Sequence, residues 1–331
     1  MHMVVLAAFL PMEYGNFVIR ESRKAGATLT SAIQTGRCGL LKQEVAMSLF
    51  DLSGPESIKT IPFPSEQDGL LPYIRRRQPL LLSGIKESLP FIQDWNYDFF
   101  RESLKSIRIQ RQSEDGIYHY LGFERIPMAE FDEVMRTTGN GYALEPLKGR
   151  GVSEDLPNDV SVTLPAFVPQ SRFRVSNLYI GPGKNKSLLH YDETHSLLMM
   201  LEGRKRFILF APDQSDCMYP YSPFSLRALL ENRVVDSKID CQKLDLEAFP
   251  KLGKAKGITG WLEEGQALFI PAGTWHFIEA EGRNVSVNYF WLQNRVRDWL
   301  QQPLLDFWLK RRAIDVLDQL RKVKHKLSAA A

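Results

Sequence analysis

Ser196-Leu-Leu-Met-Met-Leu-Glu-Gly-Arg-Lys-Arg-Phe-Ile-Leu-Phe210 consists of two apolar runs separated by the pair Glu202-Gly203. Both runs are short, and a Glu-Gly pair between them is typical of a tight turn joining antiparallel strands. Further strands bounded by turns are predicted on both sides, at residues 172–180, 266–270 and 284–291. This pattern of short strands and turns predicts a mainly β fold of the barrel or jelly-roll class.

The segment before this β region mixes helical and strand signals. A short apolar run closed by a glycine, residues 79–84, predicts a buried strand. Other predicted elements are a helix capped by Asp94 and ending near Leu104, a strand at 106–112, a helix at 128–136 and a long loop at 139–169. We therefore expect residues 47–171 to form an α/β support for a barrel made by residues 172–291, with residues 212–257 as an insertion.

The two ends of the chain differ from the barrel region in their periodicity. Residues 1–46 show no sustained period and predict a loosely ordered arm, with Met47 as an alternative start. Residues 292–331 have the period of helices with a kink at Pro303. The first predicted apolar face contains Val296, Trp299, Leu300, Leu304, Phe307 and Trp308, and the second contains Ile314, Leu317, Leu320, Val323 and Leu327. Faces of this size must cover either the barrel or a second copy of the chain, and we expect a homodimer through these helices.

The composition is that of an ordinary globular protein. The chain has 331 residues, 44% of them hydrophobic, and a formal net charge of +3, which is too small to indicate nucleic-acid binding. Its three cysteines have no metal-binding or disulfide spacing, so a reducing compartment is expected. Because the first residues lack a basic flank and no apolar stretch approaches the roughly 20 residues of a membrane span, we expect a location in the cytoplasm, or in the nucleus of a eukaryote.

The motif His190-Tyr-Asp192 places an imidazole and a carboxylate two residues apart. In a strand, residues at this spacing point to the same face, so both groups can reach one point. His-x-Asp alone is a weak signal, because a surface pair at the end of a strand has the same spacing. A metal site requires a third ligand from elsewhere in the chain.

Two histidines remain as candidates for that third ligand. His2 and His325 lie near the termini, and His195 points away from the face of His190, which leaves His119 and His276. His276 has the better context, because it follows a strand and a rigid Pro-Gly turn, although a buried structural histidine fits the same position. Two histidines and one carboxylate form the facial triad of non-haem iron(II) oxygenases, whereas zinc sites favour cysteines or a third histidine.

Three further polar residues stand in apolar surroundings. Lys205 shares a strand face with Phe207 and Leu209, so its ammonium group must either reach water or meet an anion such as a carboxylate. Ser187 can add a hydroxyl donor to that carboxylate. Asn288 lies in the apolar last strand, where it either makes a structural hydrogen bond or contacts a cosubstrate.

Taken in order, five motifs resemble the JmjC-type, cupin-like 2-oxoglutarate oxygenases, with most likeness to the protein hydroxylase branch that includes the asparaginyl hydroxylase inhibiting hypoxia-inducible factor. The likeness covers residues 172–291 well and residues 79–84 more loosely. The motifs are Ser187-Leu-Leu-His-Tyr-Asp-Glu193, Glu202-Gly-Arg-Lys-Arg-Phe-Ile-Leu-Phe-Ala-Pro-Asp-Gln214, Met218-Tyr-Pro-Tyr221, Leu268-Phe-Ile-Pro-Ala-Gly-Thr-Trp-His276 and Val287-Asn-Tyr-Phe-Trp291.

The resemblance implies a double-stranded β-helix that binds Fe(II) and 2-oxoglutarate. It implies His190, Asp192 and His276 as iron ligands, and Lys205 and Ser187 as ligands of the distal carboxylate of 2-oxoglutarate. Asn288 and Tyr179 match pocket residues of the family. Ser196 stands where several relatives have an asparagine that contacts the cosubstrate, and Gln266 replaces a frequent aspartate.

The activity implied by the resemblance is hydroxylation of a protein side chain, with release of succinate and CO2. Lysine or arginine demethylation uses the same chemistry, but the chain has no recognisable chromatin-reading module. A tRNA-base hydroxylase is a further alternative, because the runs 75–77, 310–312 and 321–326 are basic. A non-catalytic cupin-like binding protein is the alternative from another class, and the complete triad with Lys205 argues against it.

Overall fold

The structure is a computed structural model of the chain. It describes residues 47–110, 123–137, 139, 141–153, 156–160, 162–222, 225, 235–293, 296–312 and 316. The predicted arm 1–46, the second predicted helix face and His119 lie outside the described residues.

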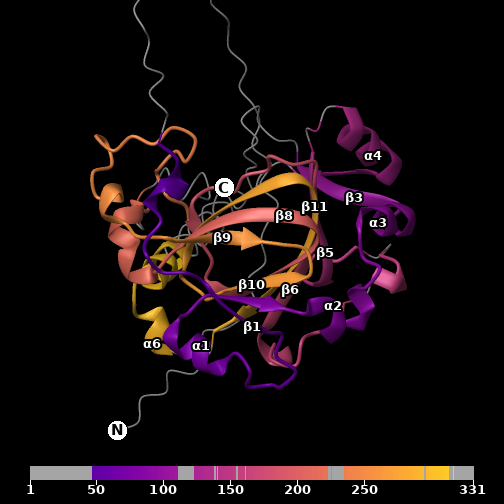
Figure 1. The fold of residues 1–331 in the computed structure, drawn as a ribbon, viewed down its shortest axis with the longest axis horizontal. Coiled ribbons are helices and arrows are strands. Elements are labelled where there is room, and N and C mark those ends of the chain that lie inside the picture. Colours follow the sequence, from indigo (N-terminus) through magenta and orange to yellow (C-terminus); the bar gives the residue numbers. More distant parts are fainter. Residues whose placement is uncertain are drawn as a thin grey trace, which may run out of the picture. The chain divides into compact units, whose positions relative to one another are not determined.

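The described residues contain an 11-stranded sheet that curls into a jelly-roll barrel (Figure 1). Its strands are β1 (Lys59–Pro62), β2 (Leu80–Ser83), β3 (Ser106–Gln110), β4 (Phe123–Pro127), β5 (Tyr142–Gly149), β6 (Phe173–Gly181), β7 (His190–Tyr191), β8 (Thr194–Phe210), β9 (Ile258–Leu262), β10 (Gln266–Ile270) and β11 (Trp275–Leu292). The helices are α1 (Leu71–Arg76), α2 (Ile85–Ser88), α3 (Tyr97–Ser103), α4 (Met128–Thr137), α6 (Val296–Trp299) and residues 304–312. None of these described helices has both the length and the apolar composition that a membrane crossing requires.

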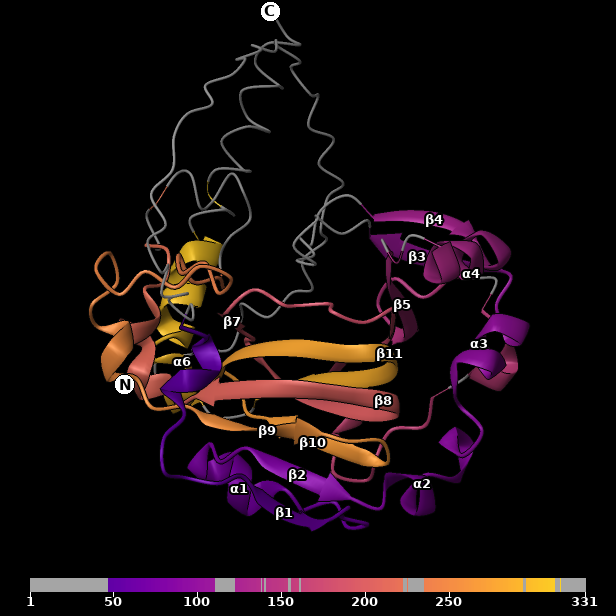
Figure 2. The same cartoon turned by 45° about the horizontal axis from the view of Figure 1, so that its top comes forward.

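The long strands β8 and β11 pair with each other along most of their length and serve both halves of the barrel (Figure 2). The first half of β8 pairs with β10, and its second half pairs with β9. Likewise, the first half of β11 pairs with β7, and its second half pairs with β6. The barrel therefore has two four-stranded walls, β10-β8-β11-β6 and β9-β8-β11-β7.

The predicted tight turn at Glu202-Gly203 is wrong, because the chain bends there without reversing. Both residues lie inside β8, at the point where its neighbour changes from β10 to β9. Gly203 has a φ of +79°, and a Cβ on it would lie 2.4 Å from the carbonyl oxygen of Arg283. Only glycine tolerates this conformation and this close approach, so the residue produces a kink instead of a hairpin.

The barrel is extended on both edges by strands from the N-terminal part of the chain. β2 and β1 continue the sheet beyond β10, and β5, β3 and β4 continue it beyond β6. The predicted strand at 79–84 and the predicted helix at 128–136 are therefore confirmed. The predicted loop at 139–169 is wrong in part, because it contains β5, which pairs with β6 despite its proline and glycine.

The helix that was expected to have Asp94 as its N-cap begins two residues later. Asn96 is the N-cap of α3, and its side-chain oxygen accepts a hydrogen bond from the amide of Phe99 at 2.9 Å. Residues 90–92 form a separate 3-10 turn before it. Asp and Asn both favour the N-cap position, so the capping preference by itself does not tell whether Asp94 or Asn96 begins the helix.

Three of the four apolar clusters among the described residues follow the alternation of the barrel strands. One covers the outer face of the wall that contains β6 and β10, where the N-terminal helices pack. A second covers the outer face of the other wall, against the described part of the insertion 212–257 and the C-terminal helices. The third fills part of the barrel interior and contains Leu198, Met200, Phe207, Leu209, Leu262, Leu268 and Ile270.

The helical region after the barrel is interrupted at Pro303, as predicted. Its single predicted apolar face is wrong in part, because the residues divide between two surroundings. Leu304 is fully buried in the cluster that contains Trp275, whereas Leu300 and Trp308 are 66% and 46% exposed. The break at Pro303 changes the direction of the chain, so a periodicity continued through it fails.

Candidate metal centre

Strand β7 and the residue directly after it present two polar side chains to the barrel interior. Its neighbours Leu189 and Tyr191 are buried in the outer cluster, so the alternation of the strand turns His190 and Asp192 inward. The backbone of His190 pairs directly with that of His276 at the start of β11, which brings the second imidazole beside the first. One ligand atom from each of the three side chains lies within 4.8 Å of the others.

The backbone holds both imidazoles in one orientation. Nδ1 of His190 lies 2.8 Å from the carbonyl oxygen of Leu188, and Nδ1 of His276 lies 3.0 Å from that of Thr274. A nitrogen facing a carbonyl carries the ring proton in the neutral imidazole, which leaves Nε2 unprotonated. Nε2 of His276 lies 3.8 Å from Oδ2 of Asp192, so the lone pair and the carboxylate face a common point.

Burial shifts the pKa values of His276 and Asp192. It lowers the pKa of His276 well below its ordinary value, and the neighbouring His190 lowers it further. Burial also raises the pKa of the Asp192 carboxyl, although His190 opposes this effect. Neutral imidazoles are the form that binds a metal, and a bound cation compensates a buried carboxylate.

The donor set fits a divalent metal of the iron(II) class. Two nitrogen donors and one oxygen donor on one side of a point leave the opposite side open for further ligands, as non-haem iron(II) sites require. His195 takes no part: its Nδ1 accepts a hydrogen bond from the amide of Ala272 at 3.1 Å, and burial lowers its pKa to about 3. Within the described part of the chain, only His190, Asp192 and His276 form such a group.

Lys205 lies in the barrel interior, on the same face of β8 as Phe207 and Leu209. It is only 4% exposed, so it does not reach water, and burial lowers its pKa to about 7. Its Nζ donates to Oγ of Ser286 at 2.7 Å and lies 5.7 Å from the ring centre of Tyr179. No carboxylate among the described residues forms an ion pair with it, which leaves an interior cation that an acidic ligand would satisfy.

The other predicted site residues are divided among three places. Oγ of Ser187 accepts a hydrogen bond from the amide of Ile278 at 3.0 Å, so its own proton remains available to donate. Oγ of Ser196 lies 3.0 Å from Oδ1 of Asn288, and the two buried side chains satisfy each other. The hydrogen bonds of these three residues given above lead to each other and to the backbone, whereas Tyr179 lies beside Lys205.

Ser286 was missed by sequence reasoning, although the sequence contained a signal for it. The last barrel strand alternates polar and apolar residues, and its apolar members belong to an outer cluster. Asn284, Ser286 and Asn288 are the polar members, and all three are buried. Polar residues at every second position of a buried strand indicate one polar interior face.

Comparison with known proteins agrees with this architecture. The model of the family described as "Cupin-like domain" matches residues 71–295. Jumonji C domain-containing protein 5 of Drosophila melanogaster is 34% identical over 34% of this chain and 26% of its own length. Lysine-specific demethylase JMJ30 of Arabidopsis thaliana is 28% identical over 51% of this chain and 38% of its own length.

A third relative aligns over more of both chains. The tRNA wybutosine-synthesizing protein 5 of Gallus gallus is 26% identical over 65% of this chain and 71% of its own length. The chain therefore spans well under half of the first two relatives and about seven tenths of the third. With a family match that covers residues 71–295, the chain belongs to the cupin-like domain family, among relatives named for their Jumonji C domains.

Proposed function

We propose that this protein is an Fe(II)- and 2-oxoglutarate-dependent dioxygenase that hydroxylates a side chain of a protein substrate. One observation carries the proposal: two imidazoles and a carboxylate converge in a barrel that also buries a lysine without an anionic partner among the described residues. The metal-binding group and the interior cation together match the two ends of a 2-oxo dicarboxylate.

Each residue has a defined task in this proposal. His190, Asp192 and His276 would hold the iron, and Lys205 would pair with the distal carboxylate of 2-oxoglutarate, with Ser187 as a second donor. Tyr179, Ser196 and Asn288 would shape the cosubstrate pocket. When bound, iron and 2-oxoglutarate supply the oxidising chemistry, in which dioxygen is consumed, 2-oxoglutarate gives succinate and CO2, and a C–H bond becomes an alcohol. The apolar interior, with Leu209 and Ile270, excludes water from the reacting groups.

A tRNA base is the second candidate substrate, because a relative named for tRNA modification aligns over 65% of this chain. The surface offers limited support for it. Two members of the predicted basic runs are not available to phosphates, because Lys310 is fully buried and Arg77 pairs with Asp298 at 3.2 Å. We therefore rank a protein substrate first, and lysine demethylation, suggested by the name of another relative, as a variant of the same chemistry.

Succinate release separates these functions. The full chain, loaded with iron(II) and given 2-oxoglutarate, is incubated with a protein fraction and with a tRNA fraction of a cell extract. Succinate that rises with the protein fraction, together with an oxygen-dependent mass increase of a peptide, supports the proposal. Succinate that rises only with tRNA supports the second candidate, and formaldehyde release indicates demethylation. Bound iron without succinate under any condition would indicate a non-catalytic binding protein.

We also propose that the protein forms a homodimer through its C-terminal helices. Leu304 covers the barrel of its own chain, but Leu300 and Trp308 remain exposed. Large apolar side chains left in water are costly, and a twofold contact between two copies would bury both pairs at once.

A further inference from the structure

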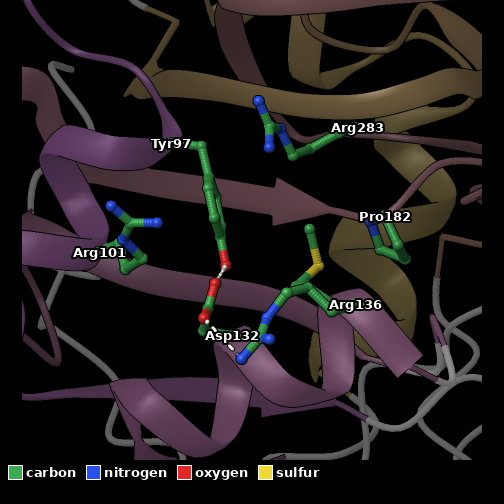
Figure 3. A pocket seen from close by; sticks show the side chains of 7 residues that line it. Tyr97, Arg101, Asp132, Arg136, Pro182 and Arg283 are labelled. Carbon is green, nitrogen blue, oxygen red and sulfur yellow. Dashed lines mark hydrogen bonds and ion pairs between the residues drawn. The ribbon is translucent and has the colours of Figure 1, made fainter.

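A pocket lined by charged and apolar side chains lies away from the metal centre, between α3, α4 and the bend of β11 at residues 281–285, where its pairing with β8 shifts register. It encloses about 350 Å³, a volume within the usual range of small-molecule sites. Figure 3 shows Tyr97 standing between Arg101 on one side and Arg136 and Arg283 on the other. Its lining residues are Tyr97, Arg101, Asp132, Met135, Arg136, Pro182 and Arg283.

The centre of the pocket is held in place by hydrogen bonds. The hydroxyl of Tyr97 donates to Oδ1 of Asp132 at 2.8 Å, and Oδ2 of the same carboxylate lies 3.2 Å from the guanidinium of Arg136. Burial, reinforced by this hydrogen bond, raises the pKa of Tyr97, so the phenol stays a donor. Asp132 is therefore committed to two protein partners, which leaves the arginines as the groups that face a ligand.

Arg283 has the firmest support of the three arginines. Its Nε donates to Oε1 of Glu202 at 2.8 Å, and the other oxygen of Glu202 accepts a hydrogen bond from the amide of Tyr97. Its guanidinium carbon lies 4.9 Å from the ring centre of Tyr97. Among the described residues, no ion pair or hydrogen bond uses its two terminal nitrogens, which retain donors for an anionic ligand.

Apart from the pair of Arg136 with Asp132, the ion pairs of the other two arginines are made with exposed carboxylates. Arg101 contacts Asp98 and Glu102, which are 62% and 76% exposed, and Arg136 contacts Glu133, which is 57% exposed. Exposed pairs of this kind contribute little stability, so a more highly charged anion can replace the carboxylates.

We propose that this pocket binds a small ligand that carries a phosphate monoester. A phosphate monoester has close to two negative charges and three acceptor oxygens, and the guanidinium groups of Arg136 and Arg283, which lie on the same side of Tyr97, can donate to it together. The ring of Tyr97 and the side chains of Met135 and Pro182 supply an apolar wall for the rest of the ligand. The site is separate from the proposed catalytic centre: Figure 2 shows α3 and α4 on the opposite side of the barrel from β7 and α6.

Calorimetric titration of the full chain with inorganic phosphate, pyrophosphate and a nucleoside monophosphate tests this proposal. We expect saturable binding that weakens about tenfold in Arg283→Gln and in Arg136→Gln, because each removes a charge-assisted donor. Arg204→Gln is the matched control: Arg204 is also exposed, pairs with Glu281 and stacks on the ring of Trp261, but lies outside the pocket. Binding in the control should match that of the unmodified chain.

Four outcomes would overturn the proposal. The first is the absence of saturable binding to all three probes by the unmodified chain. The second is equal weakening in Arg204→Gln, which would mean that the anions respond to diffuse charge. The third is loss of binding in Lys205→Ala, which would place the anion inside the barrel. A single-stranded RNA that binds more tightly than pyrophosphate and depends on Arg283 would also contradict a small ligand. Thermal unfolding of Arg136→Gln, at a 65% exposed position, checks that the variants remain folded.

Discussion

On β7 and β11, the residues that face the barrel interior and those that face outward have opposite chemistry. His190, Asp192 and His276 face inward, whereas their direct neighbours Tyr191 and Trp275 are buried in an apolar cluster. Along these segments, residues whose side chains can bind a metal therefore alternate with residues whose side chains pack in the apolar cluster. This difference predicts that the inner face can lose its polar groups without loss of the fold, whereas loss of apolar groups from the outer face destabilises it.

Removal of the inner carboxylate should have the largest effect. Asp192→Ala should abolish binding of about one iron(II) per chain, because the two neutral imidazoles lose their only anionic partner. Its thermal unfolding should match that of the unmodified metal-free chain, since burial disfavours the charged form of this carboxylate. Tyr191→Phe, on the outer face next to it, is the control and should retain the metal. Full iron occupancy in Asp192→Ala would remove the residue from the site.

The reverse experiment changes the outer face beside a proposed ligand. Phe277 is 3% exposed and lies 5.7 Å from the ring centre of Phe50. Phe277→Ala should lower the free energy of unfolding by about 3–5 kcal/mol, measured by chemical denaturation. The folded fraction should still bind one metal ion per chain. A loss of metal at unchanged stability would show that the two faces are not independent.

Lys205 and Arg206 are two neighbouring cations on opposite faces of β8, so they allow the inner and outer faces of the barrel to be compared. Lys205→Ala should weaken binding of 2-oxoglutarate by roughly ten- to hundredfold while iron remains bound, since a charge-assisted hydrogen bond contributes about 1.5–3 kcal/mol. Arg206 lies over the ring of Phe50, outside the barrel, and Arg206→Ala should leave this affinity unchanged. An unaltered Michaelis constant in Lys205→Ala would exclude the lysine from cosubstrate binding.

The protonation of Lys205 adds a pH dependence. Burial lowers its pKa from 10.5 to about 7, so the free protein increasingly loses the cation as the pH rises above about 7. Affinity for 2-oxoglutarate should fall over this range, and Lys205→Arg should flatten the profile because arginine stays charged. Since the folded chain binds this proton less tightly than the unfolded chain, this group should make the ligand-free protein more stable as the pH rises from about 7 to 10.5. An identical pH profile in Lys205→Arg would assign the titration to another group.

The smallest effect on stability is expected from changes to the exposed side chains after the barrel, Leu300 and Trp308. Leu300→Ser combined with Trp308→Ser should convert a dimer to a monomer in sedimentation, with little change in unfolding, because both side chains are exposed in the single chain. A dimer that persists in this double variant would move the interface elsewhere, and an unmodified chain that sediments as a monomer would refute the dimer.

Predictions based on the alternation of side chains along a strand succeeded where polar and apolar residues alternate without interruption. The inward direction of Lys205 followed from its alternation with Phe207 and Leu209, which lie in the interior cluster. Predictions at Gly203 and in β5 failed, because glycine and proline were taken as signs of a turn or a loop. At both places, pairing with a distant strand outweighs the local preference of the residue. The sequence alone does not reveal this pairing.

Three features can be derived from the sequence alone: the mainly β architecture, the shared face of His190 and Asp192, and the apolar surroundings of Lys205. All three follow from the two-residue period of a strand, which is a local property. Which histidine lies beside His190 depends on the pairing of β7 with β11, and the contact of Lys205 with Ser286 depends on the curling of the sheet. The arginine pocket likewise joins α3, α4 and the bend of β11, which are far apart in the chain. These contacts were decided only by the tertiary structure, because they arise from strand register and packing between distant segments and leave no periodic trace in the sequence.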